Sequence, residues 1–408
     1  MDARQERGLV IAATAKIKRQ GATYVVPSQS QPGSYKVTFG HPKAKLPKTC
    51  TCPDFDLRQM PCKHIFAVEY VIQRETRTTA KGETIVTETR GVRLTYAQDW
   101  SSYNAAATTE KEQFCRLLRD LCANVPQPEQ GRGRPRLPLS DMLFAAAFKV
   151  YSTVSGRRFM TDLRAAHESG LIAKAPHYNS IFNVIESDDV TPILHDLITA
   201  SSLPLREVEL DFAADSTGFG CSQFFRYYSM KYGREEVGHD WVKAHAMVGV
   251  KTNIVTAIRI THRNANDSPL LPALLTDTAR NFTMREVSAD KAYSGRFNAQ
   301  QIVKVGAEPL IPFKSNAKAC QYSPLWTRLY HYFAFNREEF LSRYHKRSNV
   351  EATFSMIKRV FGDSVRSKTP VAQVNEVLLK ILCHNIRCLI HEMHELGIAP
   401  AFESRLTA

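Results

Sequence analysis

No stretch of this sequence stays apolar for long enough to cross a membrane. The longest uninterrupted apolar run, Met142–Phe148, has seven residues, whereas a membrane-spanning helix needs roughly 18–20. The first residues, Met1–Arg7, carry charges of both signs and lack the apolar core of a signal peptide. We therefore expect a soluble, cytoplasmic protein without a membrane partner.

Cysteine and acidic residues are also scarce. Nine cysteines among 408 residues are too few for a disulfide scaffold, and three of them fall within thirteen positions, which favours metal binding in a reducing compartment. Forty Asp and Glu residues stand against fifty-four Lys and Arg residues, which leaves a net charge of +14 and a pI near 9.3. Such an excess predicts a polyanionic partner. With 43% hydrophobic and 23% charged residues, the composition excludes a mostly disordered or fibrous protein.

Composition divides the chain into four regions. Residues 1–80 contain strand-like segments, Tyr24–Val26 and Tyr35–Phe39, then a cysteine cluster and a helical stretch from Ile65. Residues 81–138 contain a helix predicted over 105–122, followed by a basic Gly-, Pro- and Arg-rich linker. Residues 139–200 have a helical pattern throughout.

Residues 205–395 alternate strands with helices, which predicts one α/β domain with a mixed sheet flanked by helices. The predicted strands are 208–214, 224–232, 242–249, 254–261, 287–289 and 309–312. The predicted helices are 270–279 and 298–305, with further helices from 342 to the end.

The cysteine cluster has the ligand set of a structural zinc site. Cys50, Cys52, Cys62 and His64 supply three sulfurs and one imidazole, which is the number of ligands that a closed tetrahedral zinc site requires. The alternative interpretation is a set of free thiols beside a basic loop. The spacing Cys-x-Cys-x9-Cys-x-His resembles the SWIM zinc finger over about 24–70. This resemblance implies a DNA or protein partner and no catalysis, because a closed site leaves no position for a water ligand.

Two aspartates follow predicted strands. Asp215 comes after 208–214 and Asp290 after 287–289, where ligands bind in α/β domains, although a lone Asp more often caps a turn. Asp211 is an alternative to Asp215, since residues four apart on a strand point to the same side. We prefer Asp215 because it lies at the predicted strand end.

A helix predicted over 344–358 places four polar side chains on one face. At about 100° per residue, Tyr344, Arg347 and Lys358 fall within about 40° of Glu351. An adjacent apolar stripe, which we expect to anchor this helix on the sheet, consists of Val350, Phe354, Ile357 and Phe361. The alternative is a solvated face with an Arg347–Glu351 ion pair.

Tyr344-x2-Arg347-x3-Glu351-x6-Lys358 resembles the Y-R-E-K signature of DDE insertion-sequence transposases, and the segments around Asp215 and Asp290 are similar to their aspartate motifs. Ala292 and Ser294 stand where that family often has Gly and Asp. The resemblance implies an RNase H-like core in which the catalytic residues Asp215, Asp290 and Glu351 converge.

The implied reaction is the cleavage of phosphodiester bonds at transposon ends and transfer of the 3′-hydroxyl to target DNA. Three carboxylates that hold two Mg²⁺ ions suit this chemistry, because the cations activate water and stabilise the leaving oxyanion. Two alternatives remain at this point: a non-catalytic DNA-binding regulator, and an RNase H-like nuclease without strand transfer. By analogy we expect a nucleoid-associated homodimer or higher oligomer in the active complex.

Other residues are predicted to contact DNA. Tyr344, Arg347 and Lys358 would contact phosphates near the scissile bond. Arg132 and Arg134 lie in an Arg-Gly-Arg-Pro segment that resembles an AT-hook core, although a plain basic linker would look the same. Within the helical DNA-binding region 139–200, segments 159–169 and 177–186 are candidates for a helix-turn-helix, with a plain helical scaffold as the alternative.

Overall fold

The computed structural model describes residues 3–20, 23–28, 33–39, 48–75, 99–131, 133, 135–221, 240–314 and 316–402. The chain divides into two compact units, Met1–Arg93 and Leu94–Ala408. The finer division at residues 80, 138 and 200 stays a prediction. The predicted strand 224–232, together with Arg132 and Arg134, lies outside the described residues.

The first unit is a four-stranded antiparallel meander packed against helices. Its strands pair in the order β1-β2-β3-β4, and α1 and α3 pack together. The bounds are α1 Ala3–Thr14, β1 Lys18–Gln20, β2 Thr23–Pro27, β3 Ser34–Phe39, β4 Lys48–Cys50, α2 Pro53–Arg58 and α3 Lys63–Glu75. The two predicted strands and the helix around Ile65 are confirmed. Helices α1 and α2 were not predicted, although Pro53 at the first helical position, followed by Asp54, is a helix-start signal.

The second unit begins with a helical region. Helix α4 begins at Trp100, before the predicted residue 105, because the Asp99 carboxylate accepts the backbone N–H groups of Ser101 and Ser102. The predicted all-helical region 139–200 is confirmed. The bounds are α4 Trp100–Ala123, α5 Leu139–Ser152, α6 Gly156–Glu168, α7 Tyr178–Ile185 and α8 Val190–Ser202.

A five-stranded mixed sheet follows, in the order β7-β6-β5-β8-β9. Strand β5 is antiparallel to β6 and parallel to β8, and β8 is parallel to β9. The bounds are β5 Asp211–Gly220, β6 Trp241–Gly249, β7 Val255–His262, α10 Leu271–Ala279, β8 Glu286–Ala289, α11 Arg296–Lys304 and β9 Glu308–Leu310. The predicted α/β class, the hairpin and the helices near 270 and 298 are confirmed.

The predicted end of the first strand is wrong. Strand β5 continues past Asp215 to Gly220, because β6 pairs with it along its whole length, as far as Gly220 opposite Trp241. Gly218 belongs to this strand, and a Cβ atom there would lie 2.8 Å from the Trp241 indole. Gly218 therefore allows the bulky Trp241 on β6 to approach closely.

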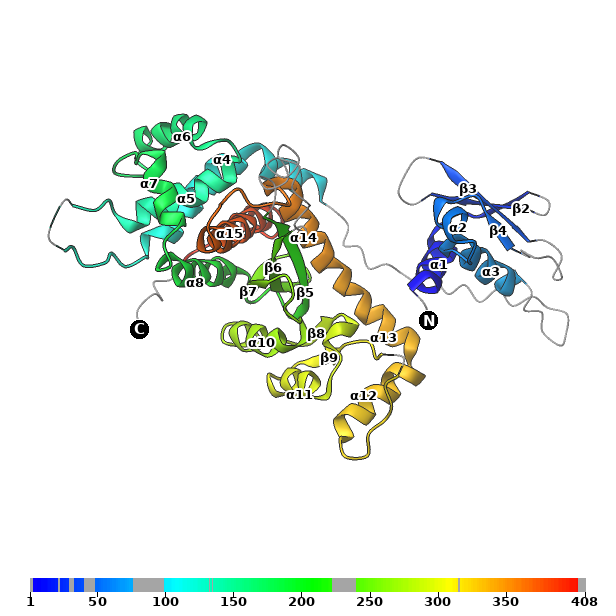
Figure 1. The fold of residues 1–408 in the computed structure, drawn as a ribbon. Coiled ribbons are helices and arrows are strands. Elements are labelled where there is room, and N and C mark those ends of the chain that lie inside the picture. The colour runs from blue at the N-terminus through cyan, green and yellow to red at the C-terminus, as the bar shows by residue number, and fades with distance from the viewer. Residues whose placement is uncertain are drawn as a thin grey trace, which may run out of the picture. The chain divides into compact units, whose positions relative to one another are not determined.

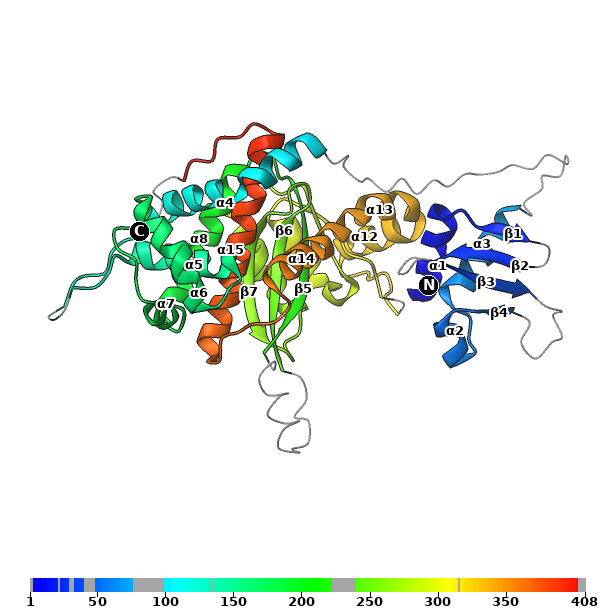
Figure 2. The same ribbon diagram turned by 90° about the horizontal axis from the view of Figure 1, so that it is seen from above.

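Helices cover both faces of the sheet (Figures 1 and 2). Helices α10 and α11 lie on one face, and α8, α14 and α15 (Pro370–Glu395) on the other. Side chains of β5 alternate between the two cores: Phe212 and Ala214 pack on the α10 side, and Ala213 and Phe219 on the α15 side. In the described part of the chain, no helix is both long and apolar enough to span a membrane.

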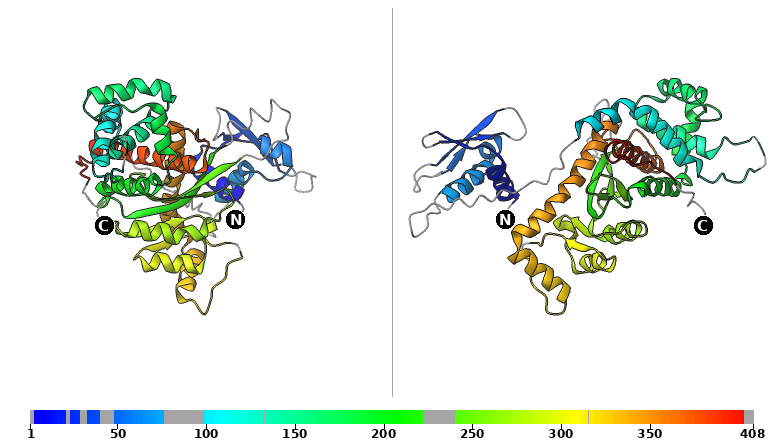
Figure 3. Two further views of the ribbon diagram at one scale, coloured as in Figure 1. Left: turned by 60° about the vertical axis from the view of Figure 1, so that its left-hand side comes forward. Right: turned by 180° about the vertical axis from the view of Figure 1, so that it is seen from behind.

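The predicted continuous helix over 344–358 is also wrong. Helix α13 (Arg337–Tyr344) ends in a 3₁₀ turn, η4 (His345–Arg347), before α14 (Ser348–Phe361) begins. The right view of Figure 3 shows these elements, coloured gold to orange, as one long helical run that follows α12 (Pro324–Phe335). A 3₁₀ turn has 3.0 residues per turn, so Tyr344 and Arg347 no longer follow the 3.6-residue spacing that was assumed. The apolar stripe is confirmed: its four members on α14 are buried.

Candidate active site and metal centre

The predicted zinc ligands form one cluster in the first unit. Cys50 ends β4, Cys52 precedes α2, Cys62 precedes α3 and His64 lies in the first turn of α3. All four residues are buried, and their ligand atoms lie within 4.8 Å of one another. The local structure thus brings both ligand pairs together at the centre of this unit's core.

The cluster fits a zinc ion. Nδ1 of His64 lies 3.8 Å from the Cys50 sulfur and 3.9 Å from the Cys62 sulfur, close to the ~3.5 Å edge of a tetrahedron built from Zn–S and Zn–N bonds of about 2.3 and 2.0 Å. The hydrogen bond between Cys50 and Cys62 lowers the pKa of Cys62 and raises that of Cys50, so Cys62 most readily forms the thiolate that metals bind. The Tyr35 ring packs against the His64 ring at a tilt of 37°, with the ring centres 4.7 Å apart.

Strand pairing in the second unit brings two of the predicted catalytic acids to one face. Ala214 of β5 pairs with Ala289 of β8 in parallel register, so Asp215 and Asp290 each stand one residue beyond this pair. Both alanines pack on the α10 side, and the alternation of side chains therefore directs both aspartates to the opposite face. Asp290 also accepts the N–H of Ala292 at 2.5 Å, which holds the turn after β8.

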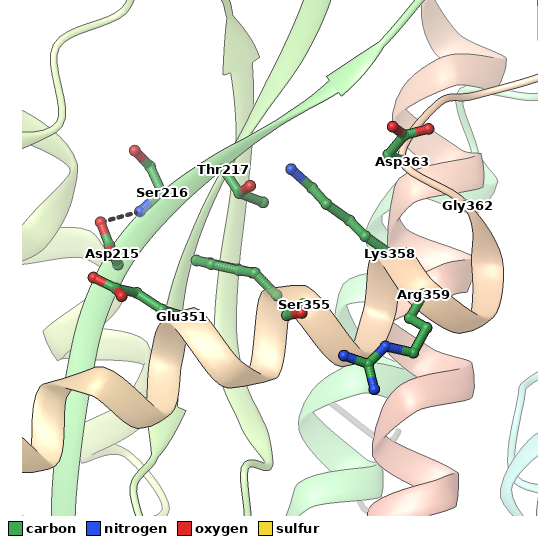
Figure 4. A pocket seen from close by; sticks show the side chains of 10 residues that line it. Asp215, Ser216, Thr217, Glu351, Ser355, Lys358, Arg359, Gly362 and Asp363 are labelled. Carbon is green, nitrogen blue, oxygen red and sulfur yellow. Dashed lines mark hydrogen bonds between the residues drawn. The ribbon is translucent and has the colours of Figure 1, made fainter. Parts of the chain in front are cut away.

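Glu351 reaches the same place from the first turn of α14. Arg347 donates one hydrogen bond to Asp215 at 2.7 Å and a second to Glu351 at 2.5 Å, so a single guanidinium joins the two carboxylates. Figure 4 shows the carboxyl groups of Asp215 and Glu351 directed toward each other. The side chain of Asp215 is 20% exposed and that of Glu351 61% exposed.

The electrostatics around Asp215 favour a cation. Burial raises its pKa above the ordinary value and the Asp290 carboxylate acts in the same direction, whereas the Ser216 N–H and Arg347 lower it. A carboxylate that is destabilised by burial and by a like charge gains the most from a nearby positive charge.

A cavity of about 640 Å³ extends from Asp215 and Glu351 along α14 (Figure 4), and Asp290 is not one of its lining residues. Residues of β5 and α14 line it: Asp215, Ser216, Thr217, Glu351, Phe354, Ser355, Lys358, Arg359, Gly362 and Asp363. Lys358 lies over the Phe219 ring at 5.5 Å, and burial lowers its pKa. The cavity is thus acidic where Asp215 and Glu351 meet. About two helical turns further along α14 it is lined by the cations Lys358 and Arg359, with Asp363 beyond them.

Tyr344 and Arg347 stand beside this cavity. The Arg347 guanidinium lies 5.9 Å from the centre of the Tyr344 ring, within the range of a cation–π contact. Burial raises the pKa of Tyr344 to about 12, so its hydroxyl stays protonated at neutral pH and can donate a hydrogen bond.

The structure separates Asp211 from the cavity. Asp211 stands at the first position of β5 and forms ion pairs with Arg285 at 2.6 Å and Lys346 at 2.8 Å. Burial raises the pKa of Asp211, but the hydrogen bonds from these two cations outweigh it, and the pKa is lowered. This geometry favours Asp215 over Asp211 as the acid that cooperates with Asp290.

Sequence reasoning missed the partners of Asp211. Lys346 stands between two residues of the predicted signature, Tyr344 and Arg347, but no sequence signal indicates which carboxylate it contacts. In the predicted helix-turn-helix, Asn179 and Asn183 on α7 are exposed, as expected of a recognition helix; that assignment stays a prediction.

Comparisons with known proteins agree with these observations. Residues 207–386 match the family model of the transposase DDE domain, and residues 35–73 match that of the SWIM zinc finger. Over 211 residues the chain is 26% identical to a probable transposase for an insertion sequence element of Archaeoglobus fulgidus, which covers 51% of this chain and 62% of that relative. The chain therefore matches less than two thirds of the relative's length. The five-stranded mixed sheet is the RNase H-like sheet that a DDE domain implies. The chain thus carries a SWIM zinc finger at residues 35–73 and, later in the sequence, a transposase DDE domain at residues 207–386.

Proposed function

We propose that this protein is a DNA transposase. It cleaves phosphodiester bonds at transposon ends and transfers the resulting 3′-hydroxyl to target DNA, with Asp215, Asp290 and Glu351 as the catalytic residues. The observation that carries the proposal is the guanidinium of Arg347, which joins Asp215 of β5 to Glu351 of α14. The parallel pairing of β5 with β8 supports it, because it places Asp290, the residue after β8, beside Asp215.

The donor set suits Mg²⁺. The three side chains offer only carboxylate oxygens, the ligands that this hard cation prefers, and two of them already share a positively charged partner. When bound, a pair of such ions activates a water molecule and stabilises the oxyanion that leaves. The carboxylates hold the ions, and the burial of Asp215 excludes water from one side of the site.

The remaining side chains position DNA. When DNA enters, Arg347 releases one of its two carboxylate partners and donates that hydrogen bond to a phosphate oxygen instead. Tyr344 donates a hydrogen bond from its hydroxyl to the DNA backbone. Lys358 contacts a phosphate further along the cavity. Such contacts set the register of the strand and carry no sequence information.

We assign the recognition of DNA sequence to other parts of the chain. The zinc finger, the α6–α7 pair, and Arg132 with Arg134 are the candidates for contacts with the transposon ends. Joining two ends requires at least two copies of the protein, so we propose a homodimer or a higher oligomer as the active complex.

The test uses DNA that flanks the gene, because the ends of an insertion sequence enclose its transposase gene. The full chain is incubated with this DNA and Mg²⁺, and the nicks are mapped. Asp290→Asn should reduce cleavage at least a hundredfold while DNA affinity stays within about twofold, because the substitution removes a ligand that acts in the transition state. Asp240→Asn, at a carboxylate 72% exposed, is the matched control and should cleave normally.

A second substrate with a pre-formed 3′-hydroxyl tests joining to a supercoiled plasmid. Cleavage without joining would identify a nuclease and contradict strand transfer. Binding without either reaction would identify a DNA-binding regulator, and wild-type cleavage by Asp290→Asn would refute the proposed catalytic residues.

A further inference from the structure

A row of charged side chains, distinct from the predicted catalytic acids, crosses the same sheet at the first residues of the parallel strands β5, β8 and β9. Asp211 of β5 pairs in register with Glu286 of β8, and Glu286 pairs with Glu308 of β9. Three carboxylates thus stand directly opposite one another across neighbouring strands. Like charges in this arrangement destabilise a sheet unless cations lie between them.

The α13–η4 segment supplies those cations. Lys346 donates hydrogen bonds to Asp211 at 2.8 Å and to Glu286 at 3.3 Å. Three residues earlier, Arg343 donates to Glu286 at 2.8 Å and also forms an ion pair with Glu308. We call these five side chains the acid–base row: Asp211, Lys346, Glu286, Arg343 and Glu308.

The centre of the row is well shielded from solvent. The side chains of Asp211 and Glu286 are 11% exposed and that of Lys346 18% exposed. Exposed ion pairs contribute little to stability, but removing one member of a shielded pair leaves an uncompensated charge and costs much more. The row therefore holds η4 firmly on β5 and β8.

The row is linked directly to the proposed catalytic acids. Lys346 binds Asp211, and the next residue, Arg347, binds Asp215. These two acids are four residues apart on one face of β5, a separation of about 13 Å at ~3.3 Å per residue. Two consecutive cations thus contact β5 at two points, which fixes both the position and the direction of the turn that leads into α14 and Glu351.

We propose that Lys346 is a positioning residue, which through Asp211 and Glu286 fixes the turn that carries Arg347 and thereby sets Arg347 and Glu351 relative to Asp215. The inference rests on the proposed function. It also explains why an acid as close as Asp211 takes no part in the chemistry: its charge is used to hold Lys346.

The test compares variants of the full chain in single-turnover cleavage of the flanking DNA with Mg²⁺. Lys346→Met keeps the length of the side chain and removes its charge. We expect its cleavage rate constant to fall about 10- to 100-fold, the order of loss that a misplacement of ~1 Å causes. DNA affinity should stay within about twofold, because the charge of Lys346 is already engaged by Asp211 and Glu286. Lys346→Arg should restore most of the rate.

The matched control is Arg285→Met. Arg285 forms an ion pair with the same carboxylate, Asp211, but belongs to the segment just before β8 and not to the α13–α14 turn, and its side chain is 60% exposed. The Arg285→Met variant should cleave DNA at close to the wild-type rate. If Lys346→Met and Arg285→Met lose the same activity, or if Lys346→Met keeps wild-type activity, the positioning role is refuted.

A double-mutant cycle with Arg347→Ala separates positioning from a general loss of folding. If Lys346 acts through Arg347, Lys346→Met should cost less than about threefold in the Arg347→Ala background. Losses that multiply, or a large fall in melting temperature for Lys346→Met that Lys346→Arg does not reverse, would refute the inference. A wild-type chain that does not cleave would refute the proposed function itself, whereas the other outcomes concern Lys346 alone.

Discussion

Removing the zinc ligand Cys62 should unfold the first unit and leave the second unit folded. Cys62→Ser replaces a thiolate by a hydroxyl, which is a poor zinc ligand, in a cluster whose four residues are all buried. Among the described residues of this unit, eleven buried apolar side chains form the core, and three of them are the cysteine ligands themselves. Little apolar surface is left to hold the meander together once the metal is lost.

The expected magnitude follows from two free energies. Structural zinc contributes an apparent ~10–16 kcal/mol to folding in zinc-finger peptides near pH 7. The net stability of a unit as long as Met1–Arg93 is roughly 5–14 kcal/mol, at about 0.05–0.15 kcal/mol per residue. Because the free energy that zinc contributes is comparable to or larger than the net free energy of unfolding, loss of the zinc ion should unfold the whole unit.

Differential scanning calorimetry and metal analysis measure the result. Wild-type protein should contain one zinc per chain and show two transitions, and Cys62→Ser should lose both the zinc and one transition. Cys320→Ser, at a half-buried cysteine of the second unit, is the control and should keep both. A Cys62→Ser protein that retains its zinc, or that loses the metal but keeps both transitions, would refute the reasoning.

Three further predictions concern the second unit. Asp215→Asn should keep or raise the melting temperature of the metal-free chain at pH 7. Folding raises the pKa of Asp215 above 3.8, so the charged carboxylate lowers the stability of the folded state once the pH rises from 3.8 through the raised pKa. A clearly lower melting temperature would contradict this. Asp211→Asn should cost about 2 kcal/mol at pH 7 in urea unfolding; since folding lowers this pKa below 3.8, the loss should shrink as pH falls through the lowered value, and a constant loss down to pH 3 would argue against it. Lys358→Met should reduce the slope of log affinity against log salt by about one for DNA binding; an unchanged slope would exclude a phosphate contact.

Much of the fold and site could be predicted because local patterns carry them. The strand-like segments 242–249 and 254–261 predicted β6 and β7, and the helical spacing of Val350, Phe354 and Ile357 predicted the face of α14 that packs on the sheet. The zinc cluster could be predicted because its ligands lie close together in the sequence. The transposase-like domain was predicted from the order of the motifs around Asp215, Asp290 and Glu351, and the match of residues 207–386 to the DDE family model supports it.

The rest depends on contacts between distant segments. Strand β5 extends past Asp215 because β6, more than twenty residues away, pairs with it. The 3₁₀ turn η4 carries the ion pairs of Lys346 and Arg347 with β5, and a helical-wheel calculation contains no such contacts with distant segments. The acid–base row exists only through strand register, so Glu286 and Glu308 look like ordinary surface acids in the sequence.

The register between β5 and β8 makes the proposed catalytic centre sensitive to a structural frameshift. One extra residue within the four-residue strand β8 would leave every motif readable, yet it would turn Asp290 toward α10, since neighbouring residues of a strand face opposite sides. The same slip would break the alignment of Glu286 with Asp211 at the other end of the strand. Related chains should therefore tolerate insertions in the loops on either side of β8 far better than within it, a pattern that motif searches alone would not detect.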